Sequence, residues 1–184
     1  MARPSPAAGI APSQGVDHRA FRSALGRFTT GVIVVTAGSR RAPHAMTANA
    51  FMSGSLDPPL VVVSVGRTAR MHQRLASVRR FGISILDRDQ EAASRHFAGQ
   101  EVAGFAPAFG ELAGVVVLAQ AAVLMAASIE HRYACGDHTL VVGRVEAIAV
   151  IEEAAPPLVY YGGRYRALQA VSAAPAAEVY PSFF

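Results

Sequence analysis

The sequence contains no lysine, because all 17 residues counted as lysine or arginine are arginines. Without a side-chain primary amine, the protein cannot form a Schiff base with a carbonyl substrate, and it lacks the lysine of a phosphate-binding P-loop. An ammonium group is equally excluded as a general base. The chemistry of the protein must therefore depend on other groups.

Cysteine is almost as scarce, because Cys135 is the single one. One cysteine cannot form an intrachain disulfide, a zinc cage of thiolates or a self-contained iron–sulfur site. Cys135 could still act as a nucleophile, although its isolated place beside an expected turn does not favour that role. Several histidines also lack a partner at metal-ligand spacing, so we predict no metal site. They are His44, His72, His96 and His131.

Charged residues are few, at 16%, whereas hydrophobic residues make up 52%. We expect so apolar a chain to bury surface against a partner, most simply against a second copy of itself in a homodimer. An uninterrupted apolar run of about 18 residues is missing, which predicts no membrane span. The net charge of +4 comes from scattered arginines without a nucleic-acid-binding motif. A small anionic ligand explains this basic bias better than nucleic acid does.

The chain of 184 residues is expected to form one folded domain. Residues 1–16 are rich in proline and alanine and lack the apolar core of a signal peptide, so they predict a disordered leader on a cytoplasmic protein. Residues 17–168 carry the periodic patterns of the domain. Residues 169–184 are expected to form a tail that is mobile or docks on a partner.

The hydrophobic pattern predicts many strands and few helices. Runs of β-branched or alternating apolar residues indicate strands separated by turn residues. They span residues 32–36, 44–51, 60–65, 81–86 and 115–118, and a long hairpin pairs 121–134 with 139–151. A doubly wound parallel sheet would require regular alternation with long helices. The pattern instead favours an antiparallel barrel with peripheral helices.

Three short helices are expected around this barrel. Asp17 caps the first, whose apolar stripe over residues 21–28 is assigned to the core. The second spans residues 68–78, and the third opens with a capping box and covers residues 87–98. Residues 99–114 are expected to form a loop.

The segment His44–Pro59 is the most informative part of the chain. It combines strand-like sequence, a cluster of small residues and a double-proline turn. Hydrogen-bonding side chains at alternate positions, from Thr47 to Ser55, would point to one face of a strand. Small side chains would also let a flat ligand lie directly against the backbone.

Six segments, taken in this order, resemble the flavin reductase family: GVIVVT (31–36), MTANAF (46–51), SLDPPLVVVSV (55–65), FGISIL (81–86), GDH (136–138) and PLVYYGGRYRAL (157–168). The resemblance covers residues 21–168. It implies a mainly β fold, the antiparallel FMN-binding split barrel, which is usually homodimeric. It also implies that NADH or NADPH reduces FMN or FAD, in many members to supply reduced flavin to a separate monooxygenase.

The resemblance assigns the binding residues as well. Thr47, Ala48 and Asn49 would lie along the flavin and offer backbone groups and an amide to its polar edge. The alternative is a strand of small residues that packs against a helix.

A second group, Ser64, Arg67 and Arg70, would lie near the ribityl chain and the phosphate of the flavin. Arginine side chains and the N-terminal amides of a helix suit a phosphate. The alternative is that both arginines are solvated charges on a helix.

His138 of the GDH segment is the expected catalytic residue and would face the nicotinamide side of the flavin. Its neighbour Asp137 would favour the protonated imidazole. Arg164 and Tyr165 could close over the nucleotide. A polar turn residue and ordinary C-terminal packing are the respective alternatives.

Hydride transfer between two cofactors needs little acid–base help, which agrees with a sequence that shows no catalytic dyad or triad. The main hypothesis is therefore an NAD(P)H-dependent flavin reductase. A non-enzymatic flavin- or haem-binding module, acting as a carrier or sensor, and an interaction subunit that docks through its tail are the alternatives. The sequence leaves open FMN or FAD, NADH or NADPH, and the identity of the monooxygenase.

Overall fold

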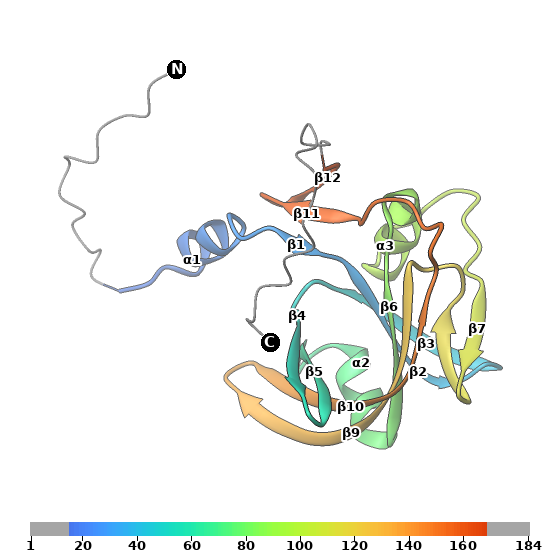
Figure 1. Cartoon of the computed structure of the whole chain (residues 1–184). Helices are drawn as coiled ribbons and strands as arrows, with labels where there is room; N and C mark the ends of the chain where they lie inside the picture. Colours follow the sequence, from blue (N-terminus) through green and yellow to red (C-terminus); the bar gives the residue numbers. More distant parts are fainter. Residues whose placement is uncertain (1–14, 169–184) are drawn as a thin grey trace.

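The computed structural model describes residues 15–168 (Figure 1). The tail predicted for residues 169–184 lies outside the described residues, as does all but the end of the leader predicted for residues 1–16. Within the described part, the strands curl into an antiparallel barrel, and helix α1 (His18–Leu25) stands away from it.

Seven strands form the main sheet, and all neighbouring pairs in it are antiparallel. From edge to edge, they are β3 (Ala42–Ala48), β2 (Ile33–Ser39), β6 (Arg80–Ile85), β9 (Val123–Cys135), β10 (His138–Val150), β5 (Pro59–Gly66) and β4 (Phe51–Leu56). The predicted fold class, a mainly β antiparallel split barrel with peripheral helices, is confirmed.

The two edge strands of this sheet are consecutive in the sequence. β3 ends at Ala48 and β4 begins at Phe51, so Asn49 and Ala50 alone join the two edges. A link of this length spans at most about 11 Å, and the sheet must therefore curl until its edges meet. Because β3 and β4 are not paired with each other, the barrel remains split at this join.

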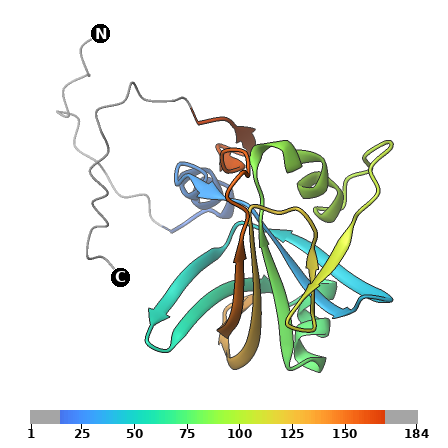
Figure 2. The same ribbon diagram turned by 45° about the vertical axis from the view of Figure 1, so that its right-hand side comes forward.

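The remaining elements lie around the barrel. A three-stranded sheet contains β1, β11 and β12, and a separate hairpin contains β7 and β8. Their bounds are β1 (Thr30–Gly31), β7 (Phe109–Leu112), β8 (Val115–Leu118), β11 (Val159–Tyr161) and β12 (Arg164–Arg166), and the helices are α2 (Arg70–Ser77), η1 (Arg88–Gln90) and α3 (Glu91–Phe97). The β7–β8 hairpin and α3 cover the same side of the barrel (Figure 2).

β2 is buried on both faces, which explains its continuous run of β-branched residues. Ile33 and Val35 belong to the cluster inside the barrel, whereas Val34 belongs to the cluster under α3 and β8. Inside the barrel, Leu75 of α2 and Phe81 of β6 are fully buried. The helix α2 thus fills the lower end of the barrel (Figure 1).

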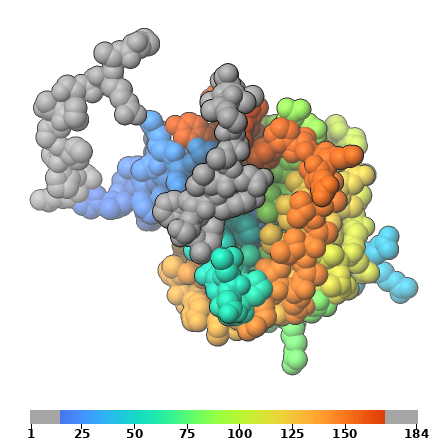
Figure 3. Space-filling view, in the orientation of Figure 1, coloured from blue at the N-terminus to red at the C-terminus, as the bar shows by residue number. Residues whose placement is uncertain are grey.

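The apolar stripe of α1 does not lie in the core, and that prediction is wrong. Asp17 caps the helix as expected, by accepting a hydrogen bond from the Ala20 backbone N–H at 3.0 Å. However, Phe21 is 53% exposed and Leu25 is 57% exposed, and α1 projects from the molecule (Figure 3). An amphipathic pattern indicates that one face needs a partner, but it does not say where that partner lies.

Two predicted boundaries are also wrong. Residues 44–51 do not form one strand. Thr47 lies in β3, Asn49 in the link and Ser53 and Ser55 in β4, so these polar residues do not share one strand face. Residues 99–114 are not wholly a loop, because β7 pairs with β8 across a turn at Ala113 and Gly114. Both turn residues have positive φ, at 48° and 73°, and an alanine in that position conceals the hairpin from sequence reasoning.

Among residues 15–168, no helix combines the length and the apolar character that a membrane crossing requires.

Gly82 permits the closest approach of the outer hairpin to the barrel. A Cβ at this position would lie 2.2 Å from the Val116 carbonyl oxygen and 2.3 Å from Thr36 Oγ1, which already donates to that oxygen. We expect Gly82→Ala to lower the free energy of unfolding by about 3 kcal/mol, because the backbone of β8 must move. Urea denaturation measures this change. Gly31→Ala is the control, since nothing lies within 4 Å of a Cβ there. Equal stabilities of the two variants would contradict the packing argument.

Candidate functional site

The first cavity of the site opens at the split of the barrel, between the end of β3, α3 and the β11–β12 hairpin. We call it the Arg95 cavity, and its volume is about 600 Å³. It brings together many of the predicted binding residues, namely Thr47, Ala48, Asn49, Arg164 and Tyr165. Residues from distant parts of the sequence therefore meet where the two edges of the sheet are joined.

Hydrogen bonds tie the walls of this cavity to each other. Thr47 Oγ1 donates to the Ser94 backbone carbonyl at 2.7 Å, and the Ser94 hydroxyl lies 2.8 Å from the hydroxyl of Tyr165. The ring of Tyr165 lies against Tyr160, with their centroids 5.4 Å apart. Helix α3 thus connects strand β3 to the β11–β12 hairpin. This helix follows a complete capping box between Asp87 and Gln90, as predicted.

Arg95 is a second cation of this cavity, beside Arg164, and sequence reasoning missed it. Its Nε donates to Glu91 at 2.7 Å, its Nη2 lies 2.6 Å from the same carboxylate, and its Nη1 donates to Gln100 at 3.1 Å. The guanidinium carbon also lies 4.9 Å from the centre of the Tyr165 ring. Four contacts therefore hold a positive charge at the cavity wall. In the sequence, Glu91 and Arg95 resemble an ordinary surface ion pair one helical turn apart.

A second cavity, of about 790 Å³, adjoins the first. We call it the apolar cavity, because most of its lining side chains are hydrophobic. They include Leu25, Phe28, Phe51, Met52, Val62 and Leu140, and Ser64 is a polar member. Asn49, Tyr160 and Gly163 line both cavities, so the two spaces adjoin at these residues. The Asn49 amide donates to Thr30 Oγ1 at 3.3 Å, which fixes the shared wall.

His138 lies beyond the cavity lining but on the same face of the sheet. In the pairing of β10 with β5, Leu140 lies opposite Ser64, and His138 lies opposite Gly66. Because side chains alternate along a strand, His138 shares the face of Leu140. Its Nδ1 lies 2.7 Å from the Asp137 carboxylate, and this hydrogen bond lowers the pKa of Asp137. The carboxylate therefore orients the imidazole.

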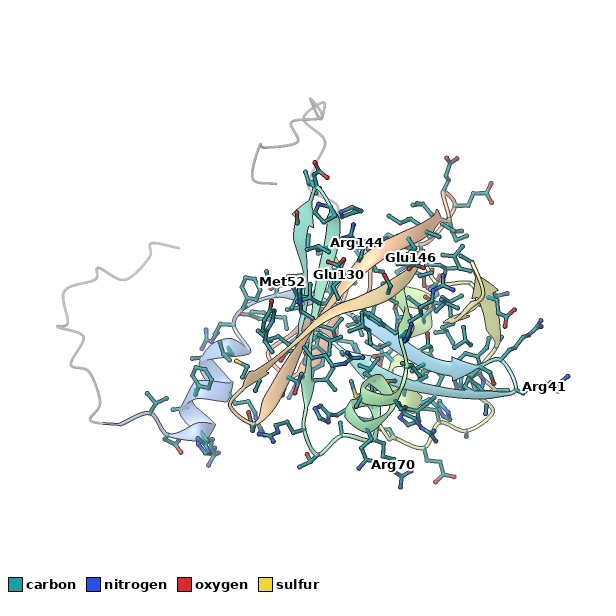
Figure 4. The ribbon with its side chains drawn as sticks, turned by 90° about the horizontal axis from the view of Figure 1, so that it is seen from below. Arg41, Met52, Arg70, Glu130, Arg144 and Glu146 are labelled. Carbon is teal, nitrogen blue, oxygen red and sulfur yellow. The ribbon has the colours of Figure 1, made fainter. Side chains whose placement is uncertain are left out.

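The structure does not bring Arg67 and Arg70 to either cavity. The backbone N–H of Arg67 donates to the Asp137 carbonyl at 2.9 Å, and its side chain is exposed. Arg70 points outward from α2 (Figure 4) and lines a separate cavity of about 360 Å³ with His44 and Arg74. Burial and the charges of Arg74 and Arg70 lower the pKa of His44. No lining residue of this small cavity belongs to the Arg95 cavity or the apolar cavity.

The other predicted features are placed as follows. Within residues 15–168, no group of three or more His, Cys, Asp and Glu side chains is positioned to hold a metal ion. His72 Nε2 lies 2.9 Å from Thr139 Oγ1, which gives that histidine a structural partner. Cys135 is exposed at the end of β9.

A split barrel that holds Arg95 in place beside an apolar cavity has the features of a cofactor-binding β-barrel protein. The barrel supplies flat apolar walls, and the arginine supplies a site for an anionic group. More specifically, the chain belongs to the flavin reductase family, because the family model of the flavin reductase like domain matches residues 25–169. The family predicted from the six segments is confirmed.

Characterised relatives cover most of the chain. An NADH-dependent flavin reductase of Rhodococcus sp. is 44% identical over 152 residues, which are 81% of this chain and 85% of that protein. The reductase component of 4-hydroxyphenylacetate 3-monooxygenase from Thermus thermophilus is 42% identical over 149 residues, or 81% of this chain and 95% of that protein. The solved flavin reductase PheA2 in its native state has a TM-score of 0.80 at 39% identity, and the match covers 84% of this chain and 100% of that structure.

Proposed function

We propose that the protein is an NAD(P)H-dependent flavin reductase, which transfers a hydride from NADH or NADPH to FMN or FAD. Its relatives include an NADH-dependent flavin reductase. The observation that carries the proposal is that the Arg95 cavity adjoins the apolar cavity and shares three lining residues with it. A ligand with a phosphate at one end and a flat ring at the other can occupy both.

Arg95 fits the phosphate of the flavin. A guanidinium group has five N–H donors, and Glu91 and Gln100 occupy three of them through Nε, Nη2 and Nη1. Two donors are left for phosphate oxygens. Because the side chain is already held in place, little conformational entropy is lost when an anion binds. We therefore favour Arg95 over Arg67 and Arg70 for this role, and the phosphate contacts of those two residues stay a prediction.

The end of β3 fits the ring of the flavin. Ala48 is small, so a planar group can approach the backbone, and Asn49 marks the passage into the apolar cavity. The hydroxyl of Thr47 is already used by the Ser94 carbonyl, so this residue offers its backbone rather than its side chain. Tyr165 is fixed by Ser94 and, with Arg164, forms the opposite wall.

The chemistry of the bound cofactors is hydride transfer from nicotinamide to flavin, so the task of the protein is to stack two rings and exclude water. The apolar cavity supplies this environment through Phe51, Val62 and Leu140. On the same face, Ser64 and His138 supply polar groups for orienting the nicotinamide. Asp137 holds the His138 ring through Nδ1, which leaves Nε2 for the nucleotide.

We infer two protein partners, a monooxygenase from the family and a second copy of the chain from the exposed stripe of α1. The Thermus relative is the reductase component of a monooxygenase, so we assign to this protein the supply of reduced flavin to such an enzyme. The exposed stripe of Phe21, Leu25 and Phe28 fits a second copy of the chain, which would make the protein a homodimer. The cytoplasmic location stays a prediction from the sequence. The assignment of residues 17–168 to a single folded domain also stays a prediction.

The reductase activity is tested by adding NADH or NADPH to the protein with FMN or FAD under anaerobic conditions. We expect the flavin absorbance to bleach, and the rates rank the four cofactor pairs. His138→Asn should lower kcat/KM for the nucleotide about tenfold, because one orienting hydrogen bond to the nucleotide is lost. Flavin that binds but stays oxidised would instead identify a carrier or sensor.

The phosphate role of Arg95 is tested by comparing FMN with riboflavin, which lacks the phosphate. We expect Arg95→Ala to raise the Kd of FMN on the order of tenfold, because a charge-assisted hydrogen bond is lost, and to leave riboflavin unaffected. Fluorescence titration measures both constants. Arg67→Ala and Arg70→Ala are matched comparisons. If either of them weakens FMN selectively while Arg95→Ala does not, the phosphate lies where the sequence first placed it.

The homodimer is tested with the double substitution Phe21→Ser and Leu25→Ser. These residues are largely exposed in the single chain, so the barrel should keep its stability. We expect sedimentation to show a dimer for the unaltered protein and a monomer for the variant, because the apolar contact is lost. A dimer that survives the substitutions would place the interface elsewhere.

A further inference from the structure

The side of α1 that faces the β11–β12 turn carries a further cavity with a basic lining. Its volume is about 500 Å³, and we call it the α1 cavity. Arg19, Arg22 and Arg27 line it from α1 and the residues that follow the helix, and Tyr161 and Gly162 line it from the turn. Three guanidinium groups thus surround one open space.

The α1 cavity adjoins the proposed reductase site. Arg22 and Gly26 line both the α1 cavity and the apolar cavity. Gly163 lines these two and the Arg95 cavity as well. The three cavities are therefore neighbours, with the apolar cavity adjoining both of the others, and we call this row of cavities the groove.

The three arginines of the α1 cavity differ from Arg95 in their ion pairing. Within residues 15–168, none of Arg19, Arg22 and Arg27 forms an ion pair. Arg95 differs, because Glu91 already neutralises part of its charge. The α1 end of the groove thus has the greater unmatched positive charge and suits a ligand with more than one negative charge.

The geometry of this end is set by the backbone. The Gly162 N–H donates to the Gly26 carbonyl at 2.8 Å, which ties the end of α1 to the β11–β12 turn. Gly162 and Gly163 have φ of 60° and 77°, and nothing lies within 4 Å of a Cβ built on either. A ligand can therefore approach the turn closely, between its backbone and the arginines.

We infer that the α1 cavity binds the diphosphate of the nicotinamide dinucleotide through Arg19, Arg22 and Arg27. This inference rests on the proposed function and assigns the two ends of the groove. The flavin phosphate lies at Arg95, the dinucleotide phosphates lie at α1, and the two rings meet in the apolar middle. The amphipathic helix then has two tasks, because Phe21 of its apolar stripe is free to face a second chain, whereas Leu25 lines the apolar cavity and the arginines face the nucleotide.

The test uses ADP-ribose, which carries the diphosphate but lacks the nicotinamide. Its binding to the full chain is measured by calorimetry, so turnover is not required. We expect Arg19→Ala, Arg22→Ala and Arg27→Ala together to raise the Kd on the order of tenfold, since several charge-assisted contacts are lost. The binding should also depend less on salt in this variant.

Arg40→Ala with Arg41→Ala is the control for removing positive charge away from the groove. These arginines line none of the three cavities, and Arg41 lies at the tip of the β2–β3 hairpin, at the far side of the molecule from α1 (Figure 4). The control should leave the Kd of ADP-ribose unchanged. The α1 variant should keep the affinity for FMN and, in turnover, raise KM for NADH with little change in kcat.

The inference is overturned if the α1 variant binds ADP-ribose as the unaltered protein does, or if the control weakens binding equally. Loss of FMN affinity in the α1 variant would also overturn it, by showing that the arginines act on the whole site. A protein that reduces flavin normally but fails these tests loses the inference and keeps the proposed function. A protein that binds ADP-ribose through α1 and never reduces flavin loses the proposed function.

Discussion

The two-residue link between β3 and β4 is the constraint on which the rest of the structure depends. It joins the opposite edges of a seven-stranded sheet, and so it forces the sheet to curl without pairing its edges. The opening left at this join is where Thr47, Ala48 and Asn49 line the Arg95 cavity. The Arg95 cavity is therefore a geometric result of how the barrel fails to close.

The sequence predicted the parts of the fold that local pattern decides. The strand Val115–Leu118 and the capping box before α3 are confirmed, because periodicity and capping act over a few residues. The exposed stripe of α1 was misplaced, because a pattern cannot distinguish the core from a partner. The β7–β8 hairpin was missed, because its turn uses Ala113 where glycine or asparagine is usual.

The candidate site divides in the same way, between what the sequence indicates and what only the tertiary structure decides. The resemblance to the family assigned residues 47–49 to the flavin and residues 164–165 to the nucleotide, and all five line the Arg95 cavity. Arg95 could not be found in this way, because its importance comes from contact with Tyr165 on a distant strand. Arg67 and Arg70 had the right chemistry, but the direction of α2 was needed to show that Arg70 opens on another cavity. Charge type is readable from sequence, whereas the direction of a side chain depends on tertiary structure.

The pairing of β1 with β11 joins the two ends of the domain, since Thr30 lies opposite Tyr160. The main sheet is complete once β10 ends at Val150, but the groove gains its last wall only when residues 159–166 arrive. During synthesis, the barrel can therefore fold before any binding groove exists, and this late long-range contact is slow to form. A chain that loses its last strands would keep every pairing of the main sheet but would lose Tyr160, Arg164 and Tyr165 from the lining of the Arg95 cavity.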